Sequence, residues 1–185
     1  MISQFVSPYQ QRKLGELNFI FPEGTNAVGR LDDESEGLLI LTTDKTLTGR
    51  LLNPKNKHHR SYIVQVEKAI EEESLEKLRN GIDILIKGKN TLYTTLPCSV
   101  TLIDKPDNLA EREDSFRDDL PQSWLEFVLT EGKNRQIRKM CKAVRHKCRR
   151  LIRTKIEDLD LGNLKPGDVI EIEQGKLFRL LKLIL

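Results

Sequence analysis

The sequence predicts an α+β fold whose sheet is mixed and largely antiparallel. Short runs that alternate apolar and polar residues, typical of half-buried strands, are interspersed with amphipathic segments typical of helices. The links between these elements are short and hairpin-like, and few are long enough for the crossovers that parallel strands need. With 185 residues, the chain can form one domain or two small lobes that share a core.

The elements expected from these patterns follow one another along the whole chain. In the first half we expect a helix at 9–17, a helix from Asp44 to about Leu52, a helix at 71–80, and strands at 27–31, 38–42, 61–67 and 83–87. In the second half we expect strands at 97–103, 123–131, 149–156 and 167–173, a polar loop at 104–121, a helix at 134–144 capped by Asn134, and a terminal helix.

The charged residues are distributed unevenly, although the net charge is only +3. Residues 133–155 contain eleven Lys and Arg and no acid, whereas residues 104–119 contain seven acids and three bases. On the expected helix at 134–144, an apolar stripe lies beside a basic stripe, so that one side faces the core and the other faces outward. A solvated basic face is the plainer interpretation, but such faces usually mix signs, so the segment favours a polyanionic partner.

The segment from Gly29 to Asp44, GRLDDESEGLLILTTD, is the most informative part of the chain. A short apolar strand leads into four acids within five positions, Asp32, Asp33, Glu34 and Glu36, and Arg30 lies just before them. A carboxylate on a tight turn at a strand end, with an arginine beside it, is held still and kept ionised. A nucleophile or base needs these conditions, whereas an arbitrary acidic loop is usually only a polar turn.

Composition argues against several other classes of protein. The three cysteines, Cys98, Cys141 and Cys148, form no CxxC pair, and the three histidines complete no zinc pattern, so we expect reduced thiols and no metal site. The first residues contain no long apolar region of the kind found in signal peptides, and no run of about 18 apolar residues occurs. We therefore expect a cytoplasmic protein without a membrane partner.

Taken together, four segments carry a resemblance to a known family. GRLDDESEGLLILTTD, SYIVQVE, SWLEFVLTEGKNRQIRKM and RRLIRTKI occur in the order found in the RsuA type of RNA pseudouridine synthases. Within that type, the chain most resembles the group that acts on large-subunit rRNA. The resemblance covers about residues 27–171, and it implies a catalytic domain over 1–185 with two sublobes flanking a central cleft, a short N-terminal region and no S4 domain.

The resemblance also implies a reaction and roles for individual residues. These enzymes detach uracil from its ribose, turn it and rejoin it through C5, without a cofactor or metal. Asp32 would attack C1′ or take the C2′ proton, and these alternatives stay open. Tyr62 would stack on the base and help to move the C5 proton, and Arg138 would pair with Asp32. Arg30 would fill the gap left by the flipped uridine.

The remaining expected roles concern binding of the substrate. Leu151 would line the base pocket, while Arg135, Lys139, Lys142, Arg149 and Arg153 are candidate phosphate contacts by charge alone. By pattern, Leu151 and Arg153 alternate on a strand as a core leucine and a surface arginine. The expected partner is 23S rRNA, modified at a specific uridine by a monomeric enzyme.

Two alternatives and two departures accompany this hypothesis. An inactive RNA-binding or ribosome-assembly protein of the same fold would use the basic segment equally well, but it would not need an acidic turn facing a polyanion. A carboxylate glycosidase would need a second catalytic acid. Arg145 and Glu157 stand where many relatives have glycine, and at Arg145 a left-handed conformation would cost about 1 kcal/mol.

Overall fold

The computed structural model describes residues 1–86, 91–112, 117 and 119–183. The helices are α1 (Leu47–Leu52), α2 (Glu72–Asn80), α3 (Gln136–Ala143) and α4 (Gln174–Leu180), with 3₁₀ turns η1 (Leu14–Glu16) and η2 (Pro54–Asn56). The strands are β1 (Asn26–Ala27), β2 (Glu36–Gly37), β3 (Leu41–Thr42), β4 (Arg60–Glu67), β5 (Asp83–Ile86), β6 (Thr91–Thr94), β7 (Ser99–Ile103), β8 (Gln122–Leu129), β9 (Cys148–Ile156) and β10 (Leu159–Asp160).

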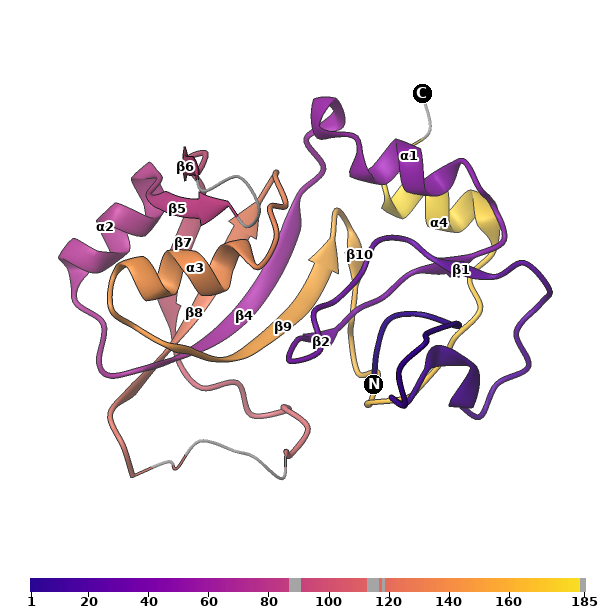
Figure 1. The fold of residues 1–185 in the computed structure, drawn as a ribbon, viewed down its shortest axis with the longest axis horizontal. Helices are drawn as coiled ribbons and strands as arrows, with labels where there is room; N and C mark the ends of the chain where they lie inside the picture. The colour runs from indigo at the N-terminus through magenta and orange to yellow at the C-terminus, as the bar shows by residue number, and fades with distance from the viewer. Residues whose placement is uncertain (87–90, 113–116, 118, 184–185) are drawn as a thin grey trace.

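The main sheet has six strands and is largely antiparallel, as predicted. Its order is β10-β9-β4-β8-β7, and β2 joins β9 in the only parallel pairing of the described strands. β4 is central and pairs along its length with β8 and β9. Figure 1 shows β4 and β9 running across the middle of the molecule, with helices on either side of them. The two sublobes expected from the sequence are therefore present.

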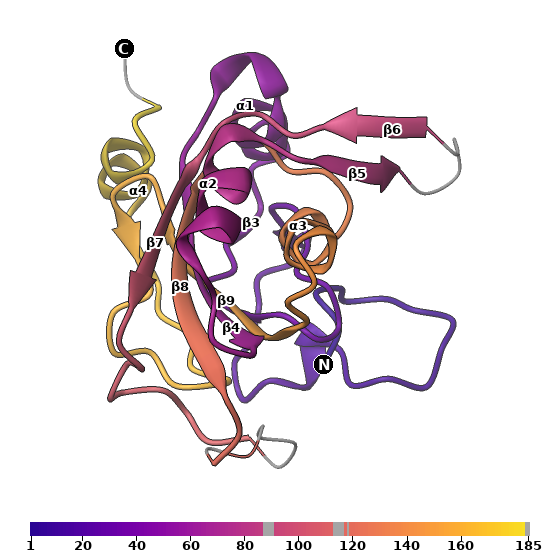
Figure 2. The same ribbon diagram turned by 90° about the vertical axis from the view of Figure 1, so that its left-hand side faces the viewer.

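The first lobe packs α2 and α3 on one face of this sheet, as Figure 2 shows. Its core joins residues of β4 and β8 to the apolar stripe of α3, with Val64, Leu125, Phe127 and Met140 all fully buried. The hairpin of β5 and β6 extends beyond the sheet in the same view. Cys141 and Cys148 belong to this core, and all three cysteines are free, as expected.

The second lobe is built from short elements around its own core. Leu47 and Leu51 of α1 pack with Ile156 at the end of β9 and with Leu181 after α4. β1 and β3 contribute only two residues each to an antiparallel pair. This lobe holds both ends of the described chain (Figure 1), so its stability depends on contacts between residues far apart in the sequence.

Several sequence predictions need correction in this lobe. The helix expected at 9–17 is reduced to the 3₁₀ turn at 14–16, and the strands expected at 27–31 and 38–42 are two-residue pairs. Residues 167–173 form no strand. Ile170 and Ile172 would share one face of a strand, yet Ile172 packs on the core while Ile170 is 59% exposed, and no neighbouring strand pairs with them among the described residues.

In the first lobe the predictions hold with smaller changes. The sequence analysis missed β6, and the strand expected at 97–103 begins at Ser99. Residue 87 of the strand expected at 83–87, and parts of the loop at 104–121, lie outside the described residues. The helix expected at 134–144 begins later, and its N-cap is Arg135 rather than Asn134. No helix in the described ranges is long and apolar enough to cross a membrane.

Candidate active site

The acidic segment predicted to carry the chemistry forms a tight turn fixed on β9. The N–H of Ser35 donates to the carbonyl of Asp32 at 2.8 Å, which closes the turn. Gly37 has a φ of +100°, and a Cβ at this position would lie 2.3 Å from the Arg153 carbonyl oxygen. Only glycine lets the backbone approach β9 this closely. The close packing of Gly37 on β9 therefore fixes the end of the acidic segment, and with it the positions of the carboxylates in the turn.

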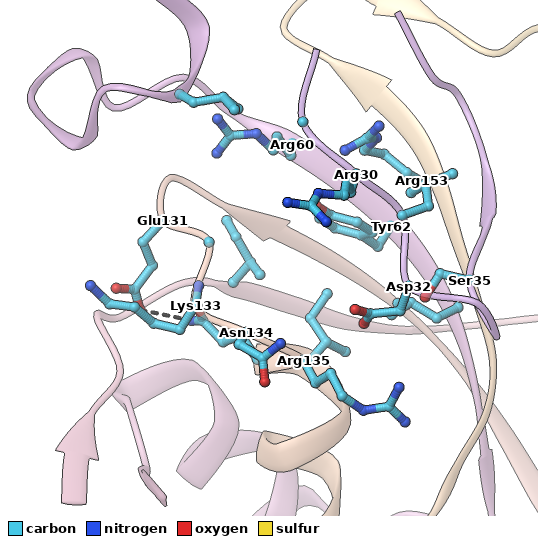
Figure 3. Close-up of a pocket in the computed structure, with 18 of the residues that line it drawn as sticks. Arg30, Asp32, Ser35, Arg60, Tyr62, Glu131, Lys133, Asn134, Arg135 and Arg153 are labelled. Carbon is cyan, nitrogen blue, oxygen red and sulfur yellow. Dashed lines mark hydrogen bonds between the residues drawn. The ribbon is translucent and has the colours of Figure 1, made fainter. Parts of the chain in front are cut away.

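Asp32 lies on the wall of a cavity of about 360 Å³. Tyr62 of β4 and Leu151 of β9 line the same cavity, and the segment from Leu129 to Ile137 closes it on the opposite side. Figure 3 shows the Asp32 carboxylate directed into this space, with Tyr62 and Arg30 beside it. The volume lies in the range of small-molecule sites, so the cavity can hold one extruded nucleotide base. We call it the base cavity.

Six predicted residues thus meet in the base cavity, namely Arg30, Asp32, Tyr62, Arg135, Leu151 and Arg153. They come from four separate segments, and the sheet register explains how those on β4 and β9 meet. Tyr62 pairs with Arg153 across β4 and β9, and Leu151 precedes Arg153 by two residues on the same strand. Leu151 is buried, whereas Arg30 is exposed at the mouth of the cavity.

Arg153 is not the surface arginine that its alternating pattern predicted. Only 6% of it is exposed, and its Nε donates to the carbonyl of Leu38 at 2.8 Å. Burial lowers the pKa of its guanidinium, and the nearby Tyr62 hydroxyl partly offsets this effect. The prediction failed because β2 and Leu38 cover this part of β9, which a strand pattern alone cannot show. Arg153 thus lines the base cavity from a buried position, and its contact with a phosphate stays a prediction.

A second, larger cavity of about 700 Å³ lies next to the base cavity, and we call it the basic cleft. Four of the predicted phosphate contacts, Arg135, Lys139, Lys142 and Arg149, line it together. The other cations on its walls are Arg112, Arg138, Arg145, Lys147 and Arg150. The basic residues of α3 and of the start of β9 therefore form one surface.

Arg138 does not form the predicted ion pair with Asp32. Its Nη2 donates to the backbone carbonyl of Glu34 at 2.6 Å, and its Nη1 donates to the carbonyl of Cys148 at 3.3 Å. Among the described residues, no cation lies within 4 Å of the Asp32 carboxylate. The reason is that the turn presents Asp32 to the base cavity and Glu34 to α3. Arg138 therefore links the turn to β9 through the carbonyls of Glu34 and Cys148, and it does not contact Asp32.

Arg135 is the residue that borders both cavities. It has a φ of 51° at the start of α3, and its Nη2 lies 2.7 Å from Glu34 Oε2. This hydrogen bond raises the pKa of the Arg135 guanidinium, with smaller contributions from the charges of Glu34 and Asp32. Arg135 therefore interacts with Glu34 directly and with the charge of Asp32 more weakly.

The segment between β8 and α3 contains a network that the sequence analysis missed. Glu131 accepts hydrogen bonds from the Tyr93 hydroxyl at 2.5 Å, the Leu96 N–H at 2.9 Å and the Gln136 side chain at 2.7 Å. Glu131 also raises the pKa of Tyr93 to about 12, mainly through this hydrogen bond. The network fixes the wall opposite Asp32 and occupies both oxygens of Glu131.

Arg60 is a second residue of the base cavity that sequence reasoning left out. Its Nη2 donates to the carbonyl of Leu51 at 2.8 Å, and it lies two residues before Tyr62 on the same face of β4. That spacing is the signal that could have identified it, since alternate residues of a strand share a face. Across the part of the chain that the structure describes, no group of His, Cys, Asp and Glu is arranged to hold a metal ion.

A turn carrying a carboxylate into a base-sized cavity, beside a cationic cleft, is the arrangement of a protein that acts on a nucleic acid. A family model described as RNA pseudouridylate synthase matches residues 19–143. These residues include the acidic turn, β4 and α3. The chain belongs to this family.

Individual relatives agree with this class. The chain is 38% identical over 174 residues to "Ribosomal large subunit pseudouridine synthase E" of Vibrio parahaemolyticus. The aligned region covers 93% of this chain and 69% of the relative. It is 40% identical over 168 residues to the protein of that name from Xanthomonas axonopodis pv. citri, covering 90% and 85%. The solved structure of a pseudouridylate synthase matches 88% of this chain and 63% of its own length, with a TM-score of 0.69 and 25% identity. The predicted family and fold class are confirmed.

Proposed function

We propose that this protein isomerises a specific uridine to pseudouridine in 23S rRNA, the RNA of the large ribosomal subunit. The observation that carries the proposal is the placement of Asp32 on a base-sized cavity that it shares with Tyr62 and Leu151. The names of the relatives in Vibrio and Xanthomonas support large-subunit rRNA as the substrate. We further propose that the protein acts as a monomer in the cytoplasm, where rRNA is found.

The reaction breaks one bond and forms another within the same nucleotide. The bond between C1′ and N1 of uridine breaks, uracil turns within the cavity, C1′ bonds to C5, the C5 proton leaves, and N1 takes up a proton. Asp32 starts the sequence, either by attacking C1′ or by removing the C2′ proton, and its position on the cavity wall serves both routes. The product is an isomer of the substrate, so the reaction requires no cofactor.

Uridine must leave its stack before a protein carboxylate can reach its glycosidic bond. Tyr62 offers an aromatic ring on which the flipped base can stack, and Leu151 provides an apolar wall beside it. Arg30 is exposed at the mouth of the cavity and can occupy the space that the nucleotide leaves in the RNA. These contacts compensate part of the few kcal/mol that unstacking costs.

The arginines at the start of α3 support Asp32 in different ways. Arg138 holds the acidic turn against β9 through the carbonyls of Glu34 and Cys148, and so it keeps Asp32 in place. Arg135 borders both cavities and supplies positive charge near the Asp32 carboxylate. A cation nearby stabilises the ionised carboxylate, which is the form that reacts.

The basic cleft binds the RNA backbone next to the flipped nucleotide. Arg135, Lys139, Lys142 and Arg149 would neutralise phosphates there, so we expect the affinity for RNA to fall steeply with salt. Glu131, the acid on the wall opposite Asp32, accepts three hydrogen bonds that hold this wall in place, so we assign it a structural role and not that of a second catalytic acid.

The experiment uses transcripts of 23S rRNA and of 16S rRNA that carry tritium at C5 of uridine. Forming pseudouridine releases this tritium to water, so we expect release from the 23S transcript alone, and mapping of the product should show one modified position. Release from the 16S transcript alone would contradict the proposal that 23S rRNA is the substrate. Binding of both transcripts without any release would favour the inactive RNA-binding alternative.

A further inference from the structure

Glu34 is the one acid among the described residues that line the basic cleft, while Glu36 and Glu67, which do not line it, pair with Arg150 and Arg149. Glu34 lines this cleft together with nine lysines and arginines, and its side chain is 60% exposed. It follows Asp32 by two residues, yet the two carboxylates border different cavities. An acid in a surface that binds phosphates weakens that binding, so the position calls for a physical reason.

The contacts of Glu34 resemble those of a bound phosphate. Its Oε2 lies 2.7 Å from Arg135 Nη2 and 3.8 Å from Arg138 Nη1. The hydrogen bond from Arg135 lowers the pKa of Glu34, and the charge of Arg138 lowers it further. Guanidinium groups recognise carboxylates and phosphates through the same fork of N–H donors, so either anion fits between these two arginines.

Two of the cations that line the same cleft each have one buried nitrogen without a hydrogen-bond partner in the part of the chain that the structure describes. The Nε of Arg138 and the Nζ of Lys139 are buried and have no hydrogen-bond partner among the described residues. The Arg138 side chain is only 9% exposed. Buried donors of charged groups are costly without a partner, and an anionic ligand entering the cleft would satisfy them.

We propose that the Glu34 carboxylate occupies the position of an RNA phosphate group between Arg135 and Arg138, and that the phosphate displaces it when RNA binds. This inference rests on the proposed function, because it assigns a phosphate subsite to the RNA of that reaction. Without RNA, Glu34 neutralises the two arginines. With RNA, Glu34 turns toward solvent, which its exposure allows, while the backbone contact of Arg138 keeps the turn closed.

The consequence is that removing the charge of Glu34 strengthens RNA binding. Glu34→Gln keeps the size of the side chain and removes the competing anion. The matched control is Glu76→Gln, which changes the net charge equally at an exposed position of α2 that lines neither cavity. The probe is a fluorescein-labelled oligouridylate, and its Kd is measured by anisotropy over a series of salt concentrations.

We expect Glu34→Gln to bind the probe about fivefold more tightly than Glu76→Gln, a change in the range of one exposed ion pair. The salt dependence should become steeper by about 0.7 for the added phosphate contact. In Arg135→Gln the same Glu34 substitution should give a much smaller gain, because one side of the subsite is gone. Unchanged or weaker binding by Glu34→Gln, or an equal gain without Arg135, would overturn the proposal.

Binding of the probe requires no isomerisation, so this result is independent of the tritium assay. If Glu34→Gln binds the probe more tightly but the wild type releases no tritium, the phosphate subsite is supported and the proposed reaction is contradicted. If the wild type releases tritium but Glu34→Gln binds the probe no more tightly, only the proposal of the phosphate subsite is contradicted.

Discussion

The two ends of the acidic turn differ although only one residue separates Asp32 from Glu34. Asp32 borders the base cavity, and no cation of the described chain lies within 4 Å of it, whereas Glu34 is paired with Arg135 and flanked by Arg138. The Asp32 carboxylate is therefore open to a substrate in the base cavity, while the Glu34 carboxylate is already held by guanidinium groups. The comparison shows that a single turn can separate reaction from binding.

The largest expected effect is at the Asp32 end of the turn. Asp32→Asn should lower tritium release by about a thousandfold or more, because it removes the reacting carboxylate. RNA affinity should be retained, since the basic cleft is unchanged. Asp33→Asn is the matched control, because it removes a neighbouring exposed charge that lines neither cavity. Equal losses of activity in both variants would mean that the turn acts only through its net charge.

The next largest effect concerns the floor of the base cavity. Arg153→Leu leaves the buried carbonyl of Leu38 without its partner, so we expect a loss of about 2 to 3 kcal/mol in the free energy of unfolding. Lys142→Leu, at an exposed position of α3 in the basic cleft, should change it by less than about 0.5 kcal/mol. Urea denaturation measures both values. Similar values for the two variants would contradict the structural role of Arg153.

A smaller effect is expected where the second lobe supports the base cavity. The side chain of Glu157 is only 5% exposed. It accepts a hydrogen bond from His59 N–H at 2.8 Å and lies 3.1 Å from Nδ1 of His58, which lines the cavity. Burial alone would raise the pKa of Glu157, but the contacts with His59, His58 and Lys182 lower it below 4.5. Glu157→Gln should therefore cost about 1 to 2 kcal/mol at neutral pH.

The pH dependence follows from the sign of this shift. A lowered pKa in the folded state adds stability above the unfolded value near 4.5, and this stability is lost as the pH falls through the folded value. The difference between wild type and Glu157→Gln should thus be constant at neutral pH and shrink below about pH 4.5. Urea denaturation at several pH values measures this difference. A difference that grows in acid would contradict the lowered pKa.

The smallest effect separates stability from binding within the basic cleft. Arg145 has a φ of 63°, so the left-handed conformation considered from the sequence is present. Arg145→Gly should raise the free energy of unfolding by up to about 1 kcal/mol and weaken binding of the oligouridylate, since one cation of the cleft is lost. Thermal melting and anisotropy test the two parts separately. A destabilised variant would contradict the assumed strain.

The first lobe was predicted more accurately than the second for a physical reason. The strands at 60–67, 122–129 and 148–156 are long, and each alternates or is strongly apolar, so local pattern and tertiary structure agree. In the second lobe, two-residue strands are held by contacts with distant segments. The sequence at 167–173 alternates, but the burial of these residues does not follow that alternation, and nothing in the sequence shows whether another strand will pair with them.

The site could be predicted as a set of residues, but its contacts could not. The ordered segments identified Asp32, Tyr62 and Leu151, which the sheet register then brings to one cavity. Charge alone could not distinguish Arg153, which is buried under Leu38, from Arg149, which is exposed on the cleft. The expected partner of Arg138 was also wrong, because the direction of each carboxylate depends on how the turn closes.

The most direct test of this account is a crystal structure of Asp32→Asn bound to an rRNA fragment that contains the modified uridine. The variant should preserve the unreacted substrate. We predict that the uridine is flipped into the base cavity, stacked on Tyr62, with its C1′ within about 3.5 Å of the side chain at position 32. A uridine that remains stacked in the RNA, or one that binds away from position 32, would contradict the central claim.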